Sequence, residues 1–398
     1  MNFYLLTVAK FAVVMAAFMT TLAYLQWVER KVLAHIQLRP GPYRVGPHGL
    51  LQPLADVIKL LTKEGVIPPH ASKPVYLLAP VLAVATALVA IAVIPFGPKI
   101  TVFGVETYMQ LTDLNIGLLF ILAASSLGVY GIALAGWASN NKYALLGGLR
   151  SAAQMISYEL PLALALAAPL LLLNSLSLRE LAEAQAGYYW GWLPRWAIFQ
   201  GPFPQLLGFV LFLVAGFAEC NRIPFDLPEA ENELVAGYHT EYSSMKFAAF
   251  FMAEYANMIT VCCVAATVFL GGWHPLFPAE YGSNFVPSAL FLAAAGIVFY
   301  HGAHPSGRRW DRYSLPVFGV VFLGLAAVFL IPALQPVLIP LFWFAVKAGG
   351  LLFLMIWVRG TLPRFRYDQL MRFAWGRLFP VAVANLLVTA FLTALVAG

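Results

Sequence analysis

Long apolar runs recur along the whole chain and are separated by short polar segments. The runs cover residues 3–28, 76–95, 115–137, 152–173, 204–222, 246–270, 285–301, 314–333, 337–358 and 379–397. A transmembrane helix needs about 20 mostly apolar residues. The runs at 285–301 and 314–333 are shorter, or interrupted by proline. The pattern predicts an all-α polytopic membrane protein with about ten transmembrane helices in a single membrane domain, residues 1–398.

The first run differs from a cleavable secretion signal. It is too long, it lacks a small-residue cleavage site, and it ends in the charged string Trp27-Val28-Glu29-Arg30-Lys31. Signal peptides have a short apolar core followed by small residues at the cleavage site. We therefore expect this segment to be retained as a helix.

A second kind of helix is predicted just after the first run, within a loop at 29–74. Residues 39–49 are rich in Pro and Gly, which favour turns. In the following stretch, 50–64, one helical face carries Leu50, Leu54, Val57 and Leu61, whereas Gln52, Asp56, Lys59 and Lys63 fall mostly on the other. A segment of this length with central charges is too short to span a bilayer and fits an amphipathic helix at the membrane interface. A simple membrane-surface spacer fits the periodicity equally well.

The composition supports a membrane protein and excludes several other classes. The chain is 61% hydrophobic and 11% charged, with a mean hydropathy of +0.79. A soluble domain has about 25% charged residues. The three cysteines, Cys220, Cys262 and Cys263, form no CxxC pair, and no Cys/His set has the spacing of metal ligands. We therefore expect no iron–sulfur cluster, haem or zinc bound by this chain, and no metal site.

The positive charge is concentrated on one side of the predicted membrane domain. Ten spans place the loops 29–74, 138–151, 219–246, 301–313 and 358–378 on the same side, and these hold 19 of the 24 Lys and Arg residues. By the positive-inside rule this side is cytoplasmic and both termini lie outside. The net charge of +6 thus marks topology, and we expect no nucleic-acid partner.

The loop at 219–246 is acidic although it lies on the positive side. It carries Glu219, Asp226, Glu229, Glu231, Glu233 and Glu241 against Arg222 and Lys246. Asp226 and Glu229 flank a proline as in a capping box and could simply start a short helix with a solvated acidic face. The loop is also rich in apolar side chains, however. Carboxylates folded against a membrane domain would have raised pKa values through desolvation and mutual repulsion.

Three predicted spans carry ionisable residues that we expect to be buried: Glu159, Glu254 and Lys347. A charge at the bilayer centre costs about 2.5–3.5 kcal/mol on insertion scales, so each residue is a functional candidate. With Glu219 they could form a chain of titratable groups from the cytoplasmic side to the middle of the membrane. Internal ion pairs, or helix-end residues that reach the interface, would explain the same residues structurally.

Four long segments resemble one known family. They run from Glu29-Arg30-Lys31 to Val45-Gly46-Pro47, from Gly49 to Glu64, from Ala218-Glu219 through Pro224-Phe225-Asp226-Leu227-Pro228-Glu229 and His239-Thr240-Glu241-Tyr242 to Asn257, and from Trp357 to Met371. They resemble the H-type membrane subunit, which belongs to the quinone module, of proton-pumping NADH:quinone oxidoreductase, respiratory complex I.

The resemblance implies three groups of functional residues. Those matching the mouth and floor of the quinone cavity are Trp27, Arg30, Arg39, Asp56 and Lys59. Those matching the carboxylate path toward the antiporter-like subunits are Glu159, Glu219, Asp226, Glu229, Glu231, Glu233, Glu241 and Glu254, with Arg150 and Arg222 as basic partners; we add the intramembrane Lys347. Those matching the loop that docks the peripheral arm are Arg359, Arg364, Arg366 and Asp368.

The resemblance also implies cofactors, partners and location. Quinone is the substrate, no redox cofactor is bound by this chain, and NADH, FMN and iron–sulfur clusters belong to partner subunits. Partners would be the peripheral quinone-module subunits, the small and antiporter-like membrane subunits, and membrane lipid, in a bacterial cytoplasmic (inner) membrane. Rival interpretations are the anchor subunit of a related membrane-bound hydrogenase, a stand-alone ion transporter and a purely structural anchor.

Two features depart from the family pattern. Cys220 stands where the family usually has threonine, a change that we expect to be neutral. The stretch 272–335 is longer than expected and contains two of the apolar runs. We interpret it as an inserted helix pair, a peripheral addition rather than part of the quinone site, which meets either lipid or another subunit.

Overall fold

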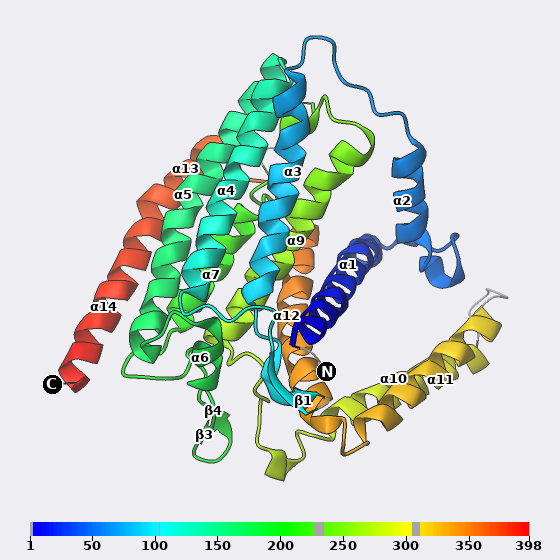
Figure 1. The fold of residues 1–398 in the computed structure, drawn as a ribbon, viewed down its shortest axis with the longest axis vertical. Coiled ribbons are helices and arrows are strands. Elements are labelled where there is room, and N and C mark those ends of the chain that lie inside the picture. The colour runs from blue at the N-terminus through cyan, green and yellow to red at the C-terminus, as the bar shows by residue number, and fades with distance from the viewer. Residues whose placement is uncertain (1–2, 103, 227–234, 305–310, 398) are drawn as a thin grey trace.

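Helices account for most of the structure, a computed structural model that describes residues 3–102, 104–226, 235–304 and 311–397 (Figure 1). The long helices are α1 (Phe3–Ile36), α3 (Lys73–Ala90), α4 (Gly117–Ala138), α5 (Lys142–Leu173), α7 (Leu206–Glu219), α9 (Ser244–Phe269), α10 (Val286–Ala303), α11 (Asp311–Phe329), α12 (Gln335–Thr361) and α14 (Phe379–Ala397). Within the described residues, nine helical segments are long and apolar enough to cross a membrane, and α7 is a shorter apolar helix. Each predicted run coincides with a helix, so the predicted fold class is confirmed.

The core of the molecule is a bundle in which α9 is the most enclosed helix. Every residue from Met258 to Phe269 is buried, as expected for a helix that is apolar on all sides. Small residues bring neighbouring helices close together. A Cβ atom on Gly131 of α4 would lie 3.0 Å from the backbone nitrogen of Ala83 on α3. Tight backbone contact through small residues is typical of packing in membranes.

Several short elements connect these helices. They are η1 (Pro47–Gly49), α2 (Gln52–Thr62), η2 (Ile91–Val93), α6 (Leu178–Glu183), η3 (Gly237–His239), η4 (Ala279–Tyr281), α13 (Tyr367–Phe373) and the π-helical turn η5 (Ala374–Leu378), together with the antiparallel strand pairs β1–β2 (Gly97–Val102 and Val105–Met109) and β3–β4 (Tyr188–Tyr189 and Leu193–Pro194). Of these, only α2 was predicted, as the amphipathic helix at 50–64. Its apolar side chains Leu54, Val57 and Leu61 are exposed, as a helix lying on an apolar surface requires.

Loops assigned to the same side by the charge pattern meet at one end of the bundle, which we call the basic end (loops 37–51, 63–72, 139–141, 235–243 and 362–366). The Ser72 backbone N–H donates to the Ala138 carbonyl at 3.0 Å. The Ser244 hydroxyl donates to the Leu60 carbonyl at 2.8 Å. Both strand pairs and both chain termini lie toward the opposite end (Figure 1).

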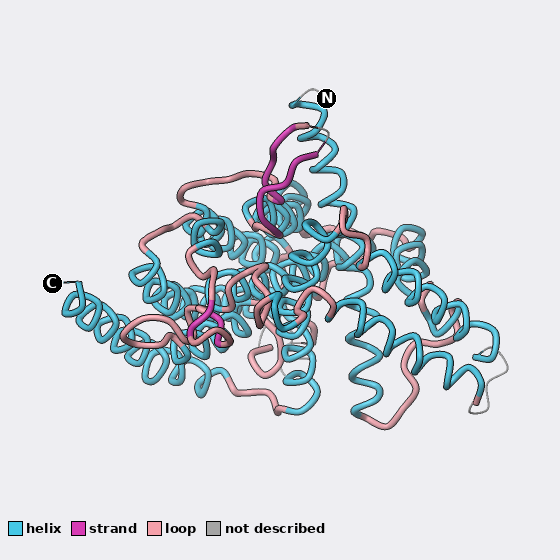
Figure 2. The backbone as a smooth tube through the Cα atoms, turned by 90° about the horizontal axis from the view of Figure 1, so that it is seen from below, coloured by secondary structure: helices cyan, strands magenta, loops and turns pink. Residues whose placement is uncertain are grey.

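Helices α10 and α11 form a hairpin that extends away from the bundle in both views (Figures 1 and 2). Its two helices pack on each other through the Phe291 and Phe322 rings, whose centroids lie 6.3 Å apart. This is the helix pair predicted within 272–335.

Candidate functional site

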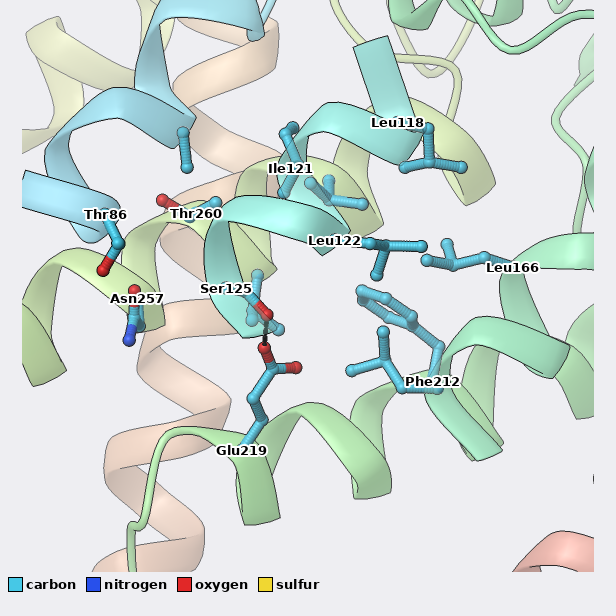
Figure 3. Close-up of a pocket in the computed structure, with 14 residues that line it drawn as sticks. Thr86, Leu118, Ile121, Leu122, Ser125, Leu166, Phe212, Glu219, Asn257 and Thr260 are labelled. Atoms are coloured by element: carbon cyan, nitrogen blue, oxygen red, sulfur yellow. Dashed lines mark hydrogen bonds between the residues drawn. The ribbon is translucent and has the colours of Figure 1, made fainter. Parts of the chain in front are cut away.

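Two carboxylates from different helices are held side by side inside the bundle. Glu219 ends α7 and is buried, and Glu159 lies on α5. Helix α4 presents a hydroxyl group to each of them. The Ser125 hydroxyl donates to Glu219 Oε1, and the Ser126 hydroxyl donates to Glu159 Oε1 (Figure 3 shows the first contact). Since the two serines are consecutive, α4 brings both acidic groups to one position along the bundle.

Glu219 also lines two small cavities. One, of about 30 Å³, is mainly apolar and is bordered by Ser125 and Asn257 as well as Glu219 (Figure 3). The other, of about 20 Å³, is bordered by Glu219, Asn257 and Glu254. The Tyr238 hydroxyl donates to Glu254 Oε1 at 3.1 Å. The structure therefore brings Glu254 to the same cavity as Glu219.

Glu241 lies at the basic end, where it is bound by the loop between α4 and α5 and by helix α3. The Asn141 side-chain amide donates to Glu241 Oε1 at 2.6 Å, and the Tyr76 hydroxyl donates to the Glu241 carbonyl at 2.7 Å. Nearby His239 is buried against the rings of Phe247 and Phe251. Desolvation lowers the pKa of His239 to about 4, so this imidazole is neutral at pH 7.

The last loop is bound to the acidic loop through Asp226. The buried Asp226 carboxylate lies 2.8 Å from the Arg364 guanidinium, and the Phe365 backbone N–H donates to the Pro224 carbonyl at 3.0 Å. Arg366 pairs with exposed Asp368 at 3.6 Å. The predicted path residues Glu229, Glu231 and Glu233 lie outside the described residues.

A buried ion cluster around Glu29 was not predicted from the sequence. Helix α1 continues to Ile36, beyond the predicted end of its span, and so places Glu29 inside the fold, 1% exposed. The Arg222 guanidinium donates to Glu29 Oε1 at 3.1 Å, and Arg359 contacts the same oxygen. The Arg222 guanidinium also lies over the Tyr255 ring, 4.2 Å from its centroid. The sequence contained one signal for this cluster, since Glu29 is followed directly by two basic residues. No local pattern, however, indicated that its partners would be Arg222 and Arg359, which are distant along the chain.

The predicted quinone-cavity residues are only partly brought together. Arg30 on α1 pairs with Asp56 on α2 at 2.8 Å, and Lys59 approaches the same carboxylate at 3.4 Å. Trp27 lies one turn before Arg30 on α1, with the Lys31 ammonium 5.6 Å from its ring centroid. The fifth residue of this group, Arg39, does not join the Asp56 cluster.

Arg39 and Arg150 make contacts outside these clusters. The exposed Arg39 side chain donates to its neighbour Gln37 at 2.7 Å. Arg150 lies with its guanidinium 5.8 Å from the Tyr367 ring centroid. Arg150 thus faces the last loop, the one predicted to dock the peripheral arm.

Lys347 lies at the far end of α9 from the basic end. Its ammonium donates to the carbonyls of Leu270, Gly272 and His274 at 2.5, 2.9 and 2.6 Å. A cation at this position satisfies carbonyls that a helix leaves without partners at its C-terminus. Glu254 lies 16 residues before Leu270, about 24 Å along the helix axis. The structure therefore does not bring Lys347 to the glutamates.

The described side chains offer no obvious metal centre. Across residues 3–102, 104–226, 235–304 and 311–397, no group of three or more His, Cys, Asp and Glu side chains could hold a metal ion. Cys220, Cys262 and Cys263 are buried thiols.

Comparison with known proteins gives consistent similarities along nearly the full length of the chain. A family described as NADH dehydrogenase matches residues 9–390. The chain is 65% identical over 393 residues to the first H-type subunit of NADH-quinone oxidoreductase from Solibacter usitatus, covering 99% of this chain and 98% of that protein. It is 49% identical over 403 residues to the second H-type subunit of the same enzyme from Koribacter versatilis, with 99% and 98% covered. The second H-type subunit from Geobacter metallireducens is 43% identical over 406 residues, with 99% and 97% covered.

Proposed function

Because the chain belongs to the NADH dehydrogenase family as an H-type subunit of NADH-quinone oxidoreductase, we propose that it forms the membrane side of the quinone cavity and couples quinone reduction to proton translocation. The observation that carries the proposal is the position of Glu219, which shares a cavity with Glu254 and lies beside Glu159 through the consecutive Ser125 and Ser126 hydroxyls. We also propose that NADH, FMN and the iron–sulfur clusters are bound by partner subunits and not by this chain.

The mouth of the proposed cavity is the junction of α1 and α2. Asp56 holds Arg30 and Lys59 at this junction, while the exposed leucine and valine side chains of α2 face outward. A quinone has a polar headgroup and an apolar tail. A charged cluster beside an apolar interfacial helix suits such a molecule, since each part of the quinone meets a surface of its own polarity.

The carboxylate pair supplies a place to hold a proton inside the bundle. In the contacts observed, the Ser125 and Ser126 hydroxyls donate to Glu219 and Glu159. When a carboxylic acid takes up a proton, its O–H can donate to the serine oxygen instead, because a hydroxyl both donates and accepts. Reduction of quinone creates negative charge that must be met by protons. We propose that the pair takes up such a proton and passes the proton, or a displacement of charge, laterally through the bundle.

We further propose how this membrane-embedded protein is arranged in the cell. The membrane is a bacterial inner membrane, the basic end faces the cytoplasm, and both termini lie on the outer side. The loops containing Arg364, Arg366 and Asp368 dock the peripheral quinone-module subunits, and other faces of the bundle contact the small and antiporter-like membrane subunits. The distribution of Lys and Arg supports this orientation.

The test is Glu219→Gln in the complex purified from native membranes. Neutralising this carboxylate should lower inhibitor-sensitive NADH:quinone reduction by about a hundredfold, while NADH:ferricyanide reduction and subunit content stay normal. The matched control is Glu106→Gln, a carboxylate paired with Lys99 on the exposed β1–β2 hairpin at the opposite end. Unchanged turnover and unchanged proton pumping in Glu219→Gln would contradict the proposed path. A preparation that evolves hydrogen, or a lone active carrier, would contradict the quinone-reductase assignment itself.

A further inference from the structure

The α10–α11 hairpin is a firmly packed unit. The Ser288 hydroxyl on α10 donates to the Ala326 carbonyl on α11 at 3.2 Å. A Cβ atom on Gly319 would lie 2.7 Å from the Phe299 ring, so the two helices approach closely at this glycine. Such packing fixes the direction in which the remaining faces of α11 point.

One end of α11 is anchored on the bundle. Phe329, near its C-terminus, packs with its ring centroid 5.8 Å from that of Phe342 on α12, and Phe291 of α10 lies 5.5 Å from Phe329. These three rings hold the base of the hairpin against α12.

The other end of α11 meets the loop at the proposed quinone mouth. His48 Nε2 lies 3.1 Å from the Ser314 hydroxyl oxygen, and the His48 ring packs edge-on to Phe318 at 5.9 Å between centroids. His48 belongs to η1, the turn that leads directly into α2 with its Asp56 cluster. No pattern in the sequence connected the inserted pair with this loop.

The face of α11 that touches His48 continues as an exposed apolar stripe. Residues 314, 318, 321, 325 and 328 follow one another at helical spacing. Beyond the contact with His48, this face presents Val321 (52% exposed), Leu325 (38%) and Val328. Phe329 lies 15 residues after Ser314, which corresponds to about 22 Å along the helix axis. The stripe therefore starts at the mouth loop and leads away from it through the apolar part of the membrane.

We propose that the α10–α11 hairpin is the lipid-side wall of the quinone entrance, and that the polyprenyl tail of the quinone lies along the Phe318–Val321–Leu325–Val328 stripe. The inference rests on the proposed function and adds to it the path of the tail. A long tail attached to a headgroup in the cavity leaves along a surface that is continuous with the mouth. The stripe is continuous with the mouth because Phe318, at its first position, packs against His48 of the mouth loop. Its side chains are apolar throughout.

The test compares two substitutions on the same helix in the complete complex, reconstituted in proteoliposomes. Val321→Trp places a bulky ring on the stripe. Val320→Trp is the matched control, because Val320 is equally apolar and 61% exposed but lies on a different face of α11. Each variant is assayed for NADH-dependent reduction of a long-chain polyprenyl quinone and of a short-chain, water-soluble quinone analogue.

We expect Val321→Trp to raise the KM for the long-chain quinone by about fivefold and to leave the KM for the short-chain quinone unchanged. Val320→Trp should change neither. Equal effects of the two substitutions, or equal effects of Val321→Trp on both quinones, would overturn the proposed tail path. Absence of inhibitor-sensitive quinone reduction in the unaltered complex would instead reject the proposed function on which the inference rests.

A second measurement needs no variant and covers the case in which Val321→Trp fails to assemble. A long-chain quinone carrying a diazirine in its tail is photolysed with the unaltered complex, and the labelled peptides are mapped. The proposal is supported if residues 318–328 are labelled and an excess of unlabelled long-chain quinone suppresses this labelling. It is overturned if these residues are not labelled, or if their labelling is suppressed by excess phospholipid but not by the unlabelled quinone.

Discussion

The buried cluster of Glu29, Arg222 and Arg359 allows a quantitative test of what holds the basic end together. Glu29 Oε1 accepts from both arginines, and Glu29 and Arg222 are 1% and 5% exposed. The substitution Glu29→Gln keeps the size of the side chain but removes its charge. Two guanidinium groups then face each other without the carboxylate that separates them.

The expected loss of folding stability in Glu29→Gln follows from the burial of the ion pair. Removing one partner of a buried ion pair costs about 3–5 kcal/mol of stability, because the remaining charge is left uncompensated. The Arg359 side chain is 28% exposed and can turn toward water, whereas Arg222 cannot. We therefore expect a loss near the lower limit, about 3 kcal/mol.

The assay is unfolding of the full chain in mixed detergent micelles, followed by circular dichroism. A double-mutant cycle with Arg222→Gln isolates the interaction, and the two substitutions together should cost less than their sum by about 2 kcal/mol. Glu106→Gln, at an exposed pair, serves as the control and should cause no measurable change. Strict additivity of Glu29→Gln and Arg222→Gln would refute the assignment of a stabilising buried cluster.

Three further predictions concern other charged or titratable groups. Lys347→Met should lower stability to chemical unfolding by about 2 kcal/mol, because three carbonyls at the end of α9 lose their donor, and should leave the KM for quinone unchanged; a changed KM with normal stability would contradict this. Burial lowers the pKa of His239 to about 4 in the folded protein, whereas the pKa in the unfolded chain is about 6.5. The contribution of neutral His239 to stability is therefore complete above pH 6.5, and the free energy of unfolding falls by about 3 kcal/mol as the pH drops toward 4. The variant His239→Phe should lack this loss of stability at low pH, and the same pH profile in both proteins would contradict the prediction. Single Glu→Gln changes at Glu229, Glu231 and Glu233 should slow quinone reduction in complexes of normal subunit content, and unchanged turnover would count against their place in the path.

The transmembrane helices were predictable because their cause is local. A run of about 20 apolar residues must be helical to satisfy its own backbone in lipid, so hydropathy alone located every long helix. The short β1–β2 hairpin has no such local cause. It is fixed to α1 by Lys10, whose ammonium donates to the Thr107 hydroxyl at 2.9 Å and to the Tyr108 carbonyl at 2.8 Å, a contact between distant segments.

The same distinction applies to the candidate site. Insertion cost alone indicated that Glu254 and Lys347 needed partners inside the protein. It could not tell that Glu254 meets a tyrosine hydroxyl beside a cavity, or that Lys347 meets three backbone carbonyls at a helix end. Two charges in similarly apolar runs thus have different surroundings, because tertiary packing decides which groups lie within reach.

The position of two neighbouring residues on α1 connects the proposed mouth with the carboxylate pair. Arg30 binds Asp56 on α2, whereas Glu29, the residue before it, binds Arg222, which lies three residues after Glu219 in the chain. Both contacts are ionic. A change of charge at Asp56 therefore alters the electrostatic force on Arg30, which is the neighbour of Glu29 in α1 and so lies within a few ångströms of the contact between Glu29 and Arg222. Because Glu29 is buried, it cannot relax into water without moving Arg222. We expect Asp56→Asn to change the effect of Glu219→Gln on quinone turnover beyond additivity, and independent effects of these two substitutions would show that α1 transmits no charge displacement between them.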